Sequence, residues 1–168
     1  MDNVYRITLK QQLLLLTPAI IIYGFLGAVY LFFFGLSLPT PIYLYAFLVL
    51  FGIDLLPASI LHIQYLVKNS KAELIINRQT RRISYSNGTE NLDYCFDDLR
   101  ELYCVASYGG GRNTGYYSFG DYRFCKLIFK DDVEIVITCL MVNNIQHTLE
   151  SLLGVTAKKK LKIFAFIK

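Results

Sequence analysis

The first third of the chain contains a long run without charge. Residues 11–53 include no Asp, Glu, Lys, Arg or His over 43 consecutive positions. A bilayer core needs about 20 apolar residues for each spanning helix, so this run is too long for one helix and suits two. Two prolines within residues 36–41 predict a turn between the helices. The sequence therefore predicts a transmembrane hairpin with spans at residues 13–35 and 42–67, preceded by an N-terminal segment at residues 1–12.

Charge is also missing from the turn between the two predicted spans, whereas basic residues flank both outer ends. Arg6 and Lys10 precede the first span, and five basic residues follow the second within residues 68–82. Because cytoplasmic flanks carry an excess of Lys and Arg, we expect both termini in the cytoplasm. The four cysteines form no CxxC or Cys/His ligand spacing, so we expect reduced structural thiols on that side of the membrane.

Two ionisable residues interrupt the second predicted span. Asp54 lies near its middle, where an exposed charge costs roughly 2.5–3.5 kcal/mol on insertion scales. His62 follows eight residues later, on the same helical face. They could line a contact between helices or a gated pathway, or Asp54 could be a protonated group that serves assembly alone. One hairpin cannot enclose a pore, so a channel-like role would need several copies.

Proline is absent after residue 57, and alternating apolar and polar residues begin at about residue 72. This pattern predicts six antiparallel strands and a short amphipathic helix that ends at Gly154. The fold class expected for the whole chain is α+β: the helical hairpin, then a small β-barrel or sandwich closed by a C-terminal helix. The expected β domain covers residues 68–157, and a basic-aromatic tail covers residues 158–168.

Catalytic and metal-binding signatures are lacking. The chain has two histidines and no G-x-S-x-G, P-loop or zinc spacing. The acidic pairs at residues 97–98 and 131–132 fall at predicted turns, where Asp is favoured by its local hydrogen bonds. We therefore expect no enzymatic activity, no cofactor and no metal site.

Two stretches carry a resemblance to a known family. They are "FDDLRELYCV" at residues 96–105 and "LIFKDDVEIVITCLM" at residues 127–141, the second followed by the predicted helix. With the order of strands, they resemble bacterial pleckstrin-homology-like domains, and the whole chain is similar to small two-span membrane proteins with such a domain at the C-terminus. The resemblance implies a binding or assembly module in the bacterial inner membrane, without catalytic machinery.

The connection between the fourth and fifth predicted strands is unusually long. Residues 108–123 hold five of the eleven glycines, together with four tyrosines and two arginines. Aromatic rings and cations at such a site can hold a base and its phosphate, an anionic lipid headgroup or a protein partner. A mobile loop that packs its own tyrosines on the domain is the alternative. The candidate ligand-binding residues are Arg112, Tyr116, Tyr117, Arg123 and Lys126.

The last twelve residues combine lysines with aromatic and aliphatic side chains. They fit adsorption to an anionic membrane surface, and the alternation at residues 161–167 fits a final β-strand equally well. Residues 68–168 carry a net charge of only +4, from 15 basic and 11 acidic residues, which gives no reason to expect DNA binding. The candidate membrane-surface residues are Lys158, Lys159, Lys160 and Lys162.

Three functions remain open on the sequence. The first is a membrane-anchored regulatory module that binds lipid headgroups, a protein or other copies of itself as a homo-oligomer. The second is a cyclic-nucleotide-gated effector of antiphage defence that oligomerises and disrupts the inner membrane. The third is a small subunit of a larger membrane complex, docked through Asp54.

Overall fold

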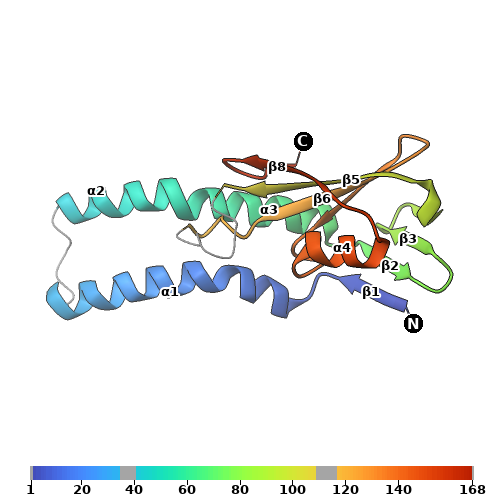
Figure 1. Cartoon of the computed structure of the whole chain (residues 1–168). Coiled ribbons are helices and arrows are strands. Elements are labelled where there is room, and N and C mark those ends of the chain that lie inside the picture. The colour runs from blue at the N-terminus through green and yellow to red at the C-terminus, as the bar shows by residue number, and fades with distance from the viewer. Residues whose placement is uncertain (1, 35–40, 109–116, 168) are drawn as a thin grey trace.

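A helical hairpin projects from one end of a β-rich domain (Figure 1). The computed structural model describes residues 2–34, 41–108 and 117–167. The first helix of the hairpin is α1, and the second consists of α2, the π-helical segment η1 and α3, which follow each other directly. The segments Leu9–Phe32 and Leu44–Asn69 are long and apolar enough to cross a membrane. The bounds are α1 Leu9–Phe34, α2 Pro41–Leu50, η1 Phe51–Leu55 and α3 Leu56–Asn69.

The first sheet contains a strand that the sequence did not predict. Residues 2–6 form β1, which pairs antiparallel with β2 on the far side of the hairpin, with Arg6 opposite Glu73. The hairpin is thus inserted between two neighbouring strands of one sheet. The five residues, DNVYR, do not alternate polar and apolar side chains, so periodicity gives no signal for a strand here. The strands, in sheet order, are β1 Asp2–Arg6, β2 Glu73–Asn77, β3 Arg82–Ser86 and β4 Asn91–Cys95.

The second sheet has the order β7-β6-β5-β8 and follows a 3-10 turn at Phe96–Asp98. Its last strand, β8, pairs parallel with β5, whereas the pairs among the six predicted strands are antiparallel as expected. No closed barrel forms from these two sheets, so the sandwich is the alternative that describes the domain. The strands are β5 Leu99–Ser107, β6 Arg123–Phe129, β7 Glu134–Thr138 and β8 Lys158–Lys162.

Both faces of the second sheet are covered. Because side chains alternate along a strand, Ile135 and Ile137 of β7 face one core while Val136 faces another. The first core lies between the two sheets and α4. The second core lies between the sheet, α3 and the C-terminal segment. This arrangement makes the second sheet a layer between the helices of the hairpin and the rest of the domain.

The helix α4 (Ile145–Leu153) closes the first core as the sequence predicted, with Ile145, Leu149 and Leu153 buried. It ends at Gly154, whose φ of 70° is the left-handed conformation that favours glycine at a helix C-terminus. Asn144 precedes the helix in a left-handed conformation and its side chain makes no capping hydrogen bond. The start of the helix therefore has no side-chain cap from Asn144.

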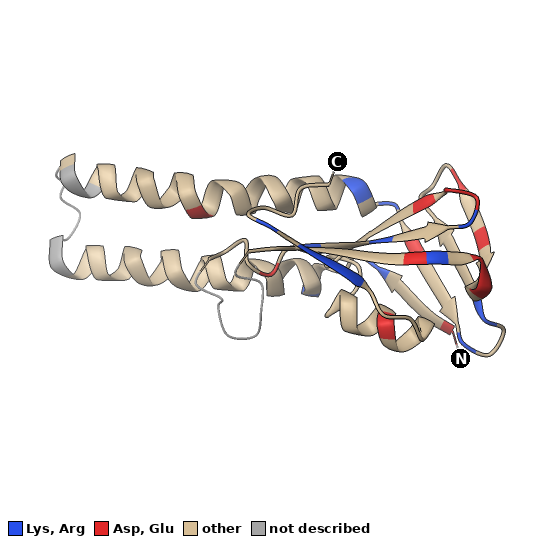
Figure 2. Cartoon of the chain, turned by 45° about the horizontal axis from the view of Figure 1, so that its top comes forward, with Lys and Arg blue, Asp and Glu red and all other residues tan. Residues whose placement is uncertain are grey.

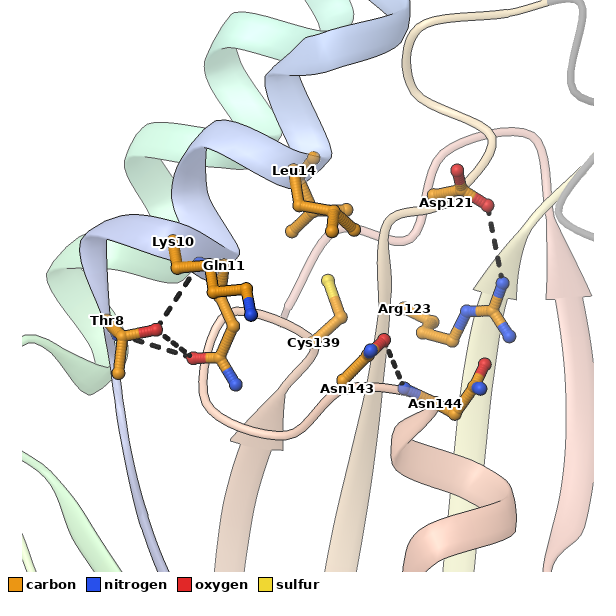
Figure 3. A pocket seen from close by; sticks show the side chains of 10 residues that line it. Thr8, Lys10, Gln11, Leu14, Asp121, Arg123, Cys139, Asn143 and Asn144 are labelled. Atoms are coloured by element: carbon orange, nitrogen blue, oxygen red, sulfur yellow. Dashed lines mark hydrogen bonds and ion pairs between the residues drawn. The ribbon is translucent and has the colours of Figure 1, made fainter.

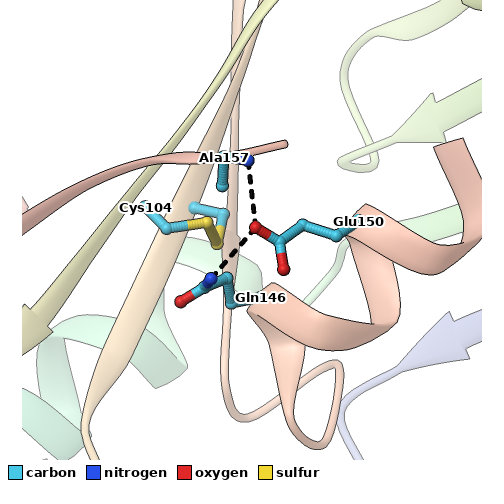
Figure 4. The surroundings of a disulfide bond; sticks show 5 residues. Cys104, Gln146, Glu150 and Ala157 are labelled. Atoms are coloured by element: carbon cyan, nitrogen blue, oxygen red, sulfur yellow. Dashed lines mark hydrogen bonds between the residues drawn. A yellow bond between two sulfur atoms is a disulfide. The ribbon is translucent and has the colours of Figure 1, made fainter. Parts of the chain in front are cut away.

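A disulfide joins Cys104 to Cys125 on neighbouring strands, under α4 (Figure 4). The two residues lie directly opposite each other in the β5–β6 register, which brings their Cα atoms to 4.1 Å. The expectation of four reduced thiols is wrong for this pair, because sequence spacing gives no information on which strand positions face each other. Cys95 and Cys139 are free, the first exposed and the second buried.

Candidate functional site

The second helix of the hairpin changes its winding at Asp54. Pro57 has no N–H, and a proline ring clashes with the carbonyl of the residue four positions earlier in a regular helix. The helix widens immediately before it: Leu56 donates its N–H to the Phe51 carbonyl, five residues back. The resulting π-helical segment η1 has one buried residue, Asp54. Such π-helical segments occur frequently at functional sites.

The Asp54 carboxylate binds the connection between β5 and β6. Its Oδ1 accepts the Ser118 backbone N–H at 2.6 Å, and its Oδ2 accepts the Ser118 hydroxyl at 2.7 Å. The Tyr23 hydroxyl of α1 donates to the same Oδ2 at 3.3 Å. Only 8% of Asp54 is exposed. This single carboxylate therefore connects both helices of the hairpin to the β domain.

His62, two turns after Asp54 on the second helix, contacts the end of the same connection. Its Nδ1 lies 2.9 Å from the hydroxyl of Tyr122, which is fully buried. Burial raises the pKa of Tyr122, so its hydroxyl stays protonated at neutral pH and remains available for this hydrogen bond. The two polar residues of the predicted span thus have partners within the chain itself.

The C-terminal segment after β8 also binds α3. Tyr65 donates its hydroxyl to the Ala165 carbonyl at 2.7 Å, and the Gln64 amide exchanges hydrogen bonds of 2.8 and 3.1 Å with the backbone of Ile167. Asn69 donates to the Val136 carbonyl of β7 at 3.0 Å. We refer to the residues of the second helix that bind the domain as the docking face: Asp54, His62, Gln64, Tyr65 and Asn69.

Only part of the predicted ligand-binding loop is described. Arg112 and Tyr116 lie outside the described residues. Tyr117 is half exposed and stacks on Phe119 with 5.1 Å between ring centroids. Phe119 is buried and contacts the Phe164 ring at 5.0 Å. Residues 117–122 therefore belong to the packed contact between the domain and α3.

The two predicted cations on β6 lie on opposite faces of the strand, because they are three residues apart. Arg123 lies 3.5 Å from the Asp121 carboxylate, and the Lys126 ammonium lies 2.7 Å from that of Glu134. The structure therefore does not bring Arg123 and Lys126 together at one ligand.

The four predicted tail lysines belong to β8, the edge strand of the second sheet. Lys158 forms an ion pair of 3.0 Å with Glu101, and Lys159 and Lys160 are exposed. Leu161 and Ile163 are exposed beside them, by 64% and 71%. A final strand does form, but the expected bounds of 161–167 are wrong: the strand is residues 158–162, including Lys162, and residues 163–167 leave the sheet and bind α3. The charged residues lie mainly in the β part and are rare along the hairpin (Figure 2).

A polar cavity of about 400 Å³ lies where α1, the end of the β5–β6 connection and the start of α4 meet (Figure 3). Lys10 and Gln11 line it from α1, and Asp121 and Arg123 line it from the domain. The buried Cys139 thiol also lines it, and burial raises its pKa to about 12, so the thiol is not a nucleophile at neutral pH. The remaining lining residues are Thr8, Leu14, Leu15, Asn143 and Asn144.

An open apolar groove of about 640 Å³ continues from this cavity along the surface of α1, and every residue that lines it belongs to that helix. Lys10 and Leu14 line both the cavity and the groove. Pro18 lies in the groove, and because it has no N–H it cannot donate to the Leu14 carbonyl, so α1 lacks one backbone hydrogen bond there. The remaining lining residues are Thr17, Ile21 and Ile22.

The comparison with protein families gives one match: a model of the PH domain covers residues 4–148. The chain therefore belongs to the PH domain family. The matched range includes β1 and the hairpin, in agreement with the insertion of the hairpin between β1 and β2. PH domains typically are non-enzymatic modules that bind lipid headgroups or proteins. No curated protein and no solved structure matches the chain significantly.

The sequence drew attention to Asp54 and His62 but did not identify their partners. Ser118 and Tyr122 are separated from them by about 60 residues, and their pairing depends on how the second sheet packs against α3. Lys10 was noted only as a basic flank of the first span. Its place in a cavity could not be inferred, since the other wall comes from the far end of the chain. Among the described residues, no group of three or more His, Cys, Asp or Glu is placed to hold a metal.

Proposed function

We propose that this chain is a membrane-anchored, non-enzymatic PH module whose binding domain is fixed directly to a transmembrane hairpin. The observation that carries the proposal is the exposure of the two apolar helices: in the most apolar 18-residue stretch of each helix, only 11% and 17% of the residues are buried. A core helix of a soluble protein would be mostly buried. Exposed apolar area of this extent is unfavourable in water and favourable in a bilayer.

The position of the domain relative to the bilayer follows from which residues of α1 it covers. The buried residues of α1 are Leu15 and Ala19, and the 16 residues from Ala19 to Phe34 extend about 24 Å at 1.5 Å per residue. A bilayer hydrocarbon core is about 30 Å thick. The near end of the domain would therefore reach the headgroup region. Tyr108, Tyr117 and Ile163 are exposed there, which suits an interface where tyrosine is enriched.

Function at this level would be recognition at the membrane surface. The β8 edge presents exposed Lys159 and Lys160, and lysines near an anionic leaflet contribute about 1 kcal/mol each to membrane attraction. The docking face holds the domain in one orientation. Any ligand of the domain would therefore be held at a fixed distance from the membrane and in a fixed orientation. Anionic lipid headgroups are the partner that this surface fits best, and self-association or a protein partner would use the same fixed orientation.

We place the hairpin in a bacterial inner membrane, as the resemblance implies. The basic flanks place both termini on its cytoplasmic side. The Cys104–Cys125 disulfide argues for the other side, since disulfides persist in oxidising compartments. An impermeant thiol reagent applied to intact cells separates the two. The exposed native Cys95 should stay unlabelled, whereas Ser37→Cys in a Cys95→Ser background should react. Labelling of Cys95 in intact cells would reverse the orientation.

Fractionation tests the anchor itself. The full chain should sediment with membranes and resist extraction at alkaline pH. Leu48→Arg should reduce the inserted fraction, because a charge at the centre of a span costs roughly 2.5–3.5 kcal/mol. Lys130→Arg, on a turn at the far end of the domain, is the matched control and should change nothing. A wild-type chain recovered in the soluble fraction would contradict the proposal.

A further inference from the structure

We propose that the cavity at the base of α1, together with the open groove that continues from it along α1, binds one anionic phospholipid, with its phosphate beside Lys10 and Arg123 and one acyl chain along α1. This inference rests on the proposed function, because the lipid would enter from the bilayer that holds the hairpin. It assigns a defined site, built between the hairpin and the domain, in addition to the general attraction of the β8 lysines for a surface.

The polar cavity has the chemistry of a phosphate site. The Lys10 ammonium has no ion-pair partner among residues 2–34, 41–108 and 117–167. Arg123 has one carboxylate neighbour, Asp121, at 3.5 Å and on one nitrogen only. The lining therefore carries two positive charges and one negative charge, a net charge of +1. A phosphodiester carries one negative charge and several acceptor oxygens, which suits a lysine and a guanidinium together.

Neutral donors surround the same space. Asn143 and Asn144 line the cavity at the start of α4 (Figure 3). The Asn144 side chain makes no capping bond to the helix, so its amide is available to a ligand. The Gln11 amide is already engaged by the Met141 carbonyl at 3.0 Å and so holds the wall in place. The cations supply the attraction, and these amides would orient the headgroup.

The apolar groove indicates which kind of molecule carries the phosphate. The groove runs from Lys10 to Ile22, which is about 18 Å along a helix at 1.5 Å per residue. One leaflet is about 15 Å deep, half of a hydrocarbon core of about 30 Å. An acyl chain therefore matches the length and chemistry of this wall. A free phosphate would leave the apolar part empty, and an uncharged lipid would leave Lys10 without a counter-ion.

The experiment is native mass spectrometry of the full-length protein released from nanodiscs that contain equal amounts of phosphatidylglycerol and phosphatidylcholine. The wild type should retain one phosphatidylglycerol per chain in preference to phosphatidylcholine, because the choline ammonium would add a positive charge to a site whose lining already carries a net charge of +1. Lys10→Gln combined with Arg123→Gln should lower this retention about tenfold, the loss expected for a charge-assisted hydrogen bond to phosphate. Ile21→Trp tests the apolar part independently: the larger ring should occupy the groove and lower retention without any change of charge.

One control removes charge elsewhere. Lys130→Gln removes a lysine from the far end of the domain and should retain the lipid as the wild type does. Loss of retention in Lys130→Gln equal to that in Lys10→Gln combined with Arg123→Gln would mean general charge attraction and would overturn the site.

The source of the phosphate is tested by adding inorganic phosphate in excess to the nanodiscs. Retention should be unchanged, because the acyl chain contributes to binding. Displacement of the lipid by inorganic phosphate would overturn the lipid assignment. All variants are first tested for incorporation into nanodiscs. A wild type that fails to incorporate contradicts the proposed anchor, whereas a wild type that incorporates and retains no anionic lipid contradicts this inference and leaves the anchor intact.

Discussion

The two halves of the second helix have similar lengths and opposite surroundings. In α2 every side chain that the structure describes is exposed, whereas α3 buries Ala58, Leu61, Tyr65 and Asn69 against the domain. The change occurs at η1, where Pro57 and the widened helix turn Asp54 toward Ser118. The same apolar helix is therefore exposed over its first half, which under the proposed function faces lipid, and forms a wall of the protein core over its second half.

This difference explains why polar residues occur in an apolar span. On α3, the face opposite the domain carries the exposed apolar residues Leu56, Ile60, Ile63 and Val67, at spacings of four, three and four. The docking face carries the hydrogen-bonding residues. Polar groups in a span are expensive unless they are partnered, and here the domain provides the partners. Polar residues in an apolar helix can thus mark where a protein's own domain attaches.

The largest difference in stability is expected between substitutions of two tyrosines of the same helix. Tyr65→Ala removes a buried ring whose centroid lies 5.7 Å from that of Tyr122 and 6.2 Å from that of Phe124. This change should destabilise the protein by about 3–5 kcal/mol, as for other buried aromatic residues. Tyr45→Ala, on α2, removes a ring that is 68% exposed and should change stability little. Thermal unfolding in detergent measures both. Equal shifts in the two midpoints would remove the distinction between the halves.

A smaller effect should come from Asp54. Asp54→Ala leaves the buried N–H and hydroxyl of Ser118 without an acceptor, which costs about 1–3 kcal/mol. Amide hydrogen exchange at Ser118 should accelerate in this variant and return toward the wild-type rate in Asp54→Asn, which keeps one acceptor oxygen. If exchange at Ser118 is the same in all three proteins, Asp54 does not hold the connection.

The His62 contact should contribute less. Tyr122→Phe removes one hydrogen bond and keeps the ring, so the expected loss of stability is about 0.5–1.5 kcal/mol. The same change at the half-exposed Tyr117 should have almost no effect. Chemical unfolding of both variants in the same detergent tests the difference. A larger loss in Tyr117→Phe would contradict the packing described for this connection.

The smallest expected effect on stability is an acid dependence that comes from α4, a helix that the membrane should not influence. In α4, the Glu150 carboxylate accepts the Ala157 N–H at 3.0 Å, and this bond holds the pKa of Glu150 below its usual range. Because the folded pKa is depressed, the contribution to stability is present above the unfolded pKa of about 4.3 and is lost as pH falls through the folded value. Glu150→Gln should lack this part of the acid dependence.

The result for Glu150 should be the same in detergent and in nanodiscs, since α4 lies against the core between the sheets. Unfolding midpoints recorded at decreasing pH for the wild type and Glu150→Gln provide the measurement. An acid dependence that differs between detergent and lipid would show that the membrane acts on this part of the domain as well.

Patterns that are local in the sequence were predictable. The uncharged run predicted both helices of the hairpin, and alternation predicted β2 to β7 within a few residues. The Asn87-Gly88 pair before β4 is a local signal of the same kind, and Gly88 has the positive φ of 85° that such turns require. The resemblance to PH-like domains was confirmed by the family match. In each case the signal lies within one element or one turn.

Pairings between distant segments were not predictable. β1 is recognisable only when β2 is known to lie beside it, and the Cys104–Cys125 disulfide follows from strand register. The partner of Asp54 comes from a connection that the sequence suggested as an open ligand loop. Such features depend on packing between elements, for which one sequence provides no local signal.

We propose that the hairpin crosses a membrane while the domain stays outside the hydrocarbon core of that membrane. The chain contains no tryptophan, so a single introduced indole reports one position without background. Phe25→Trp on α1 and Phe96→Trp in the domain are conservative changes for this purpose. In nanodiscs whose lipids are brominated near the middle of the acyl chains, the account predicts blue-shifted, strongly quenched emission from Phe25→Trp and unquenched emission from Phe96→Trp. Unquenched emission from both positions would contradict it.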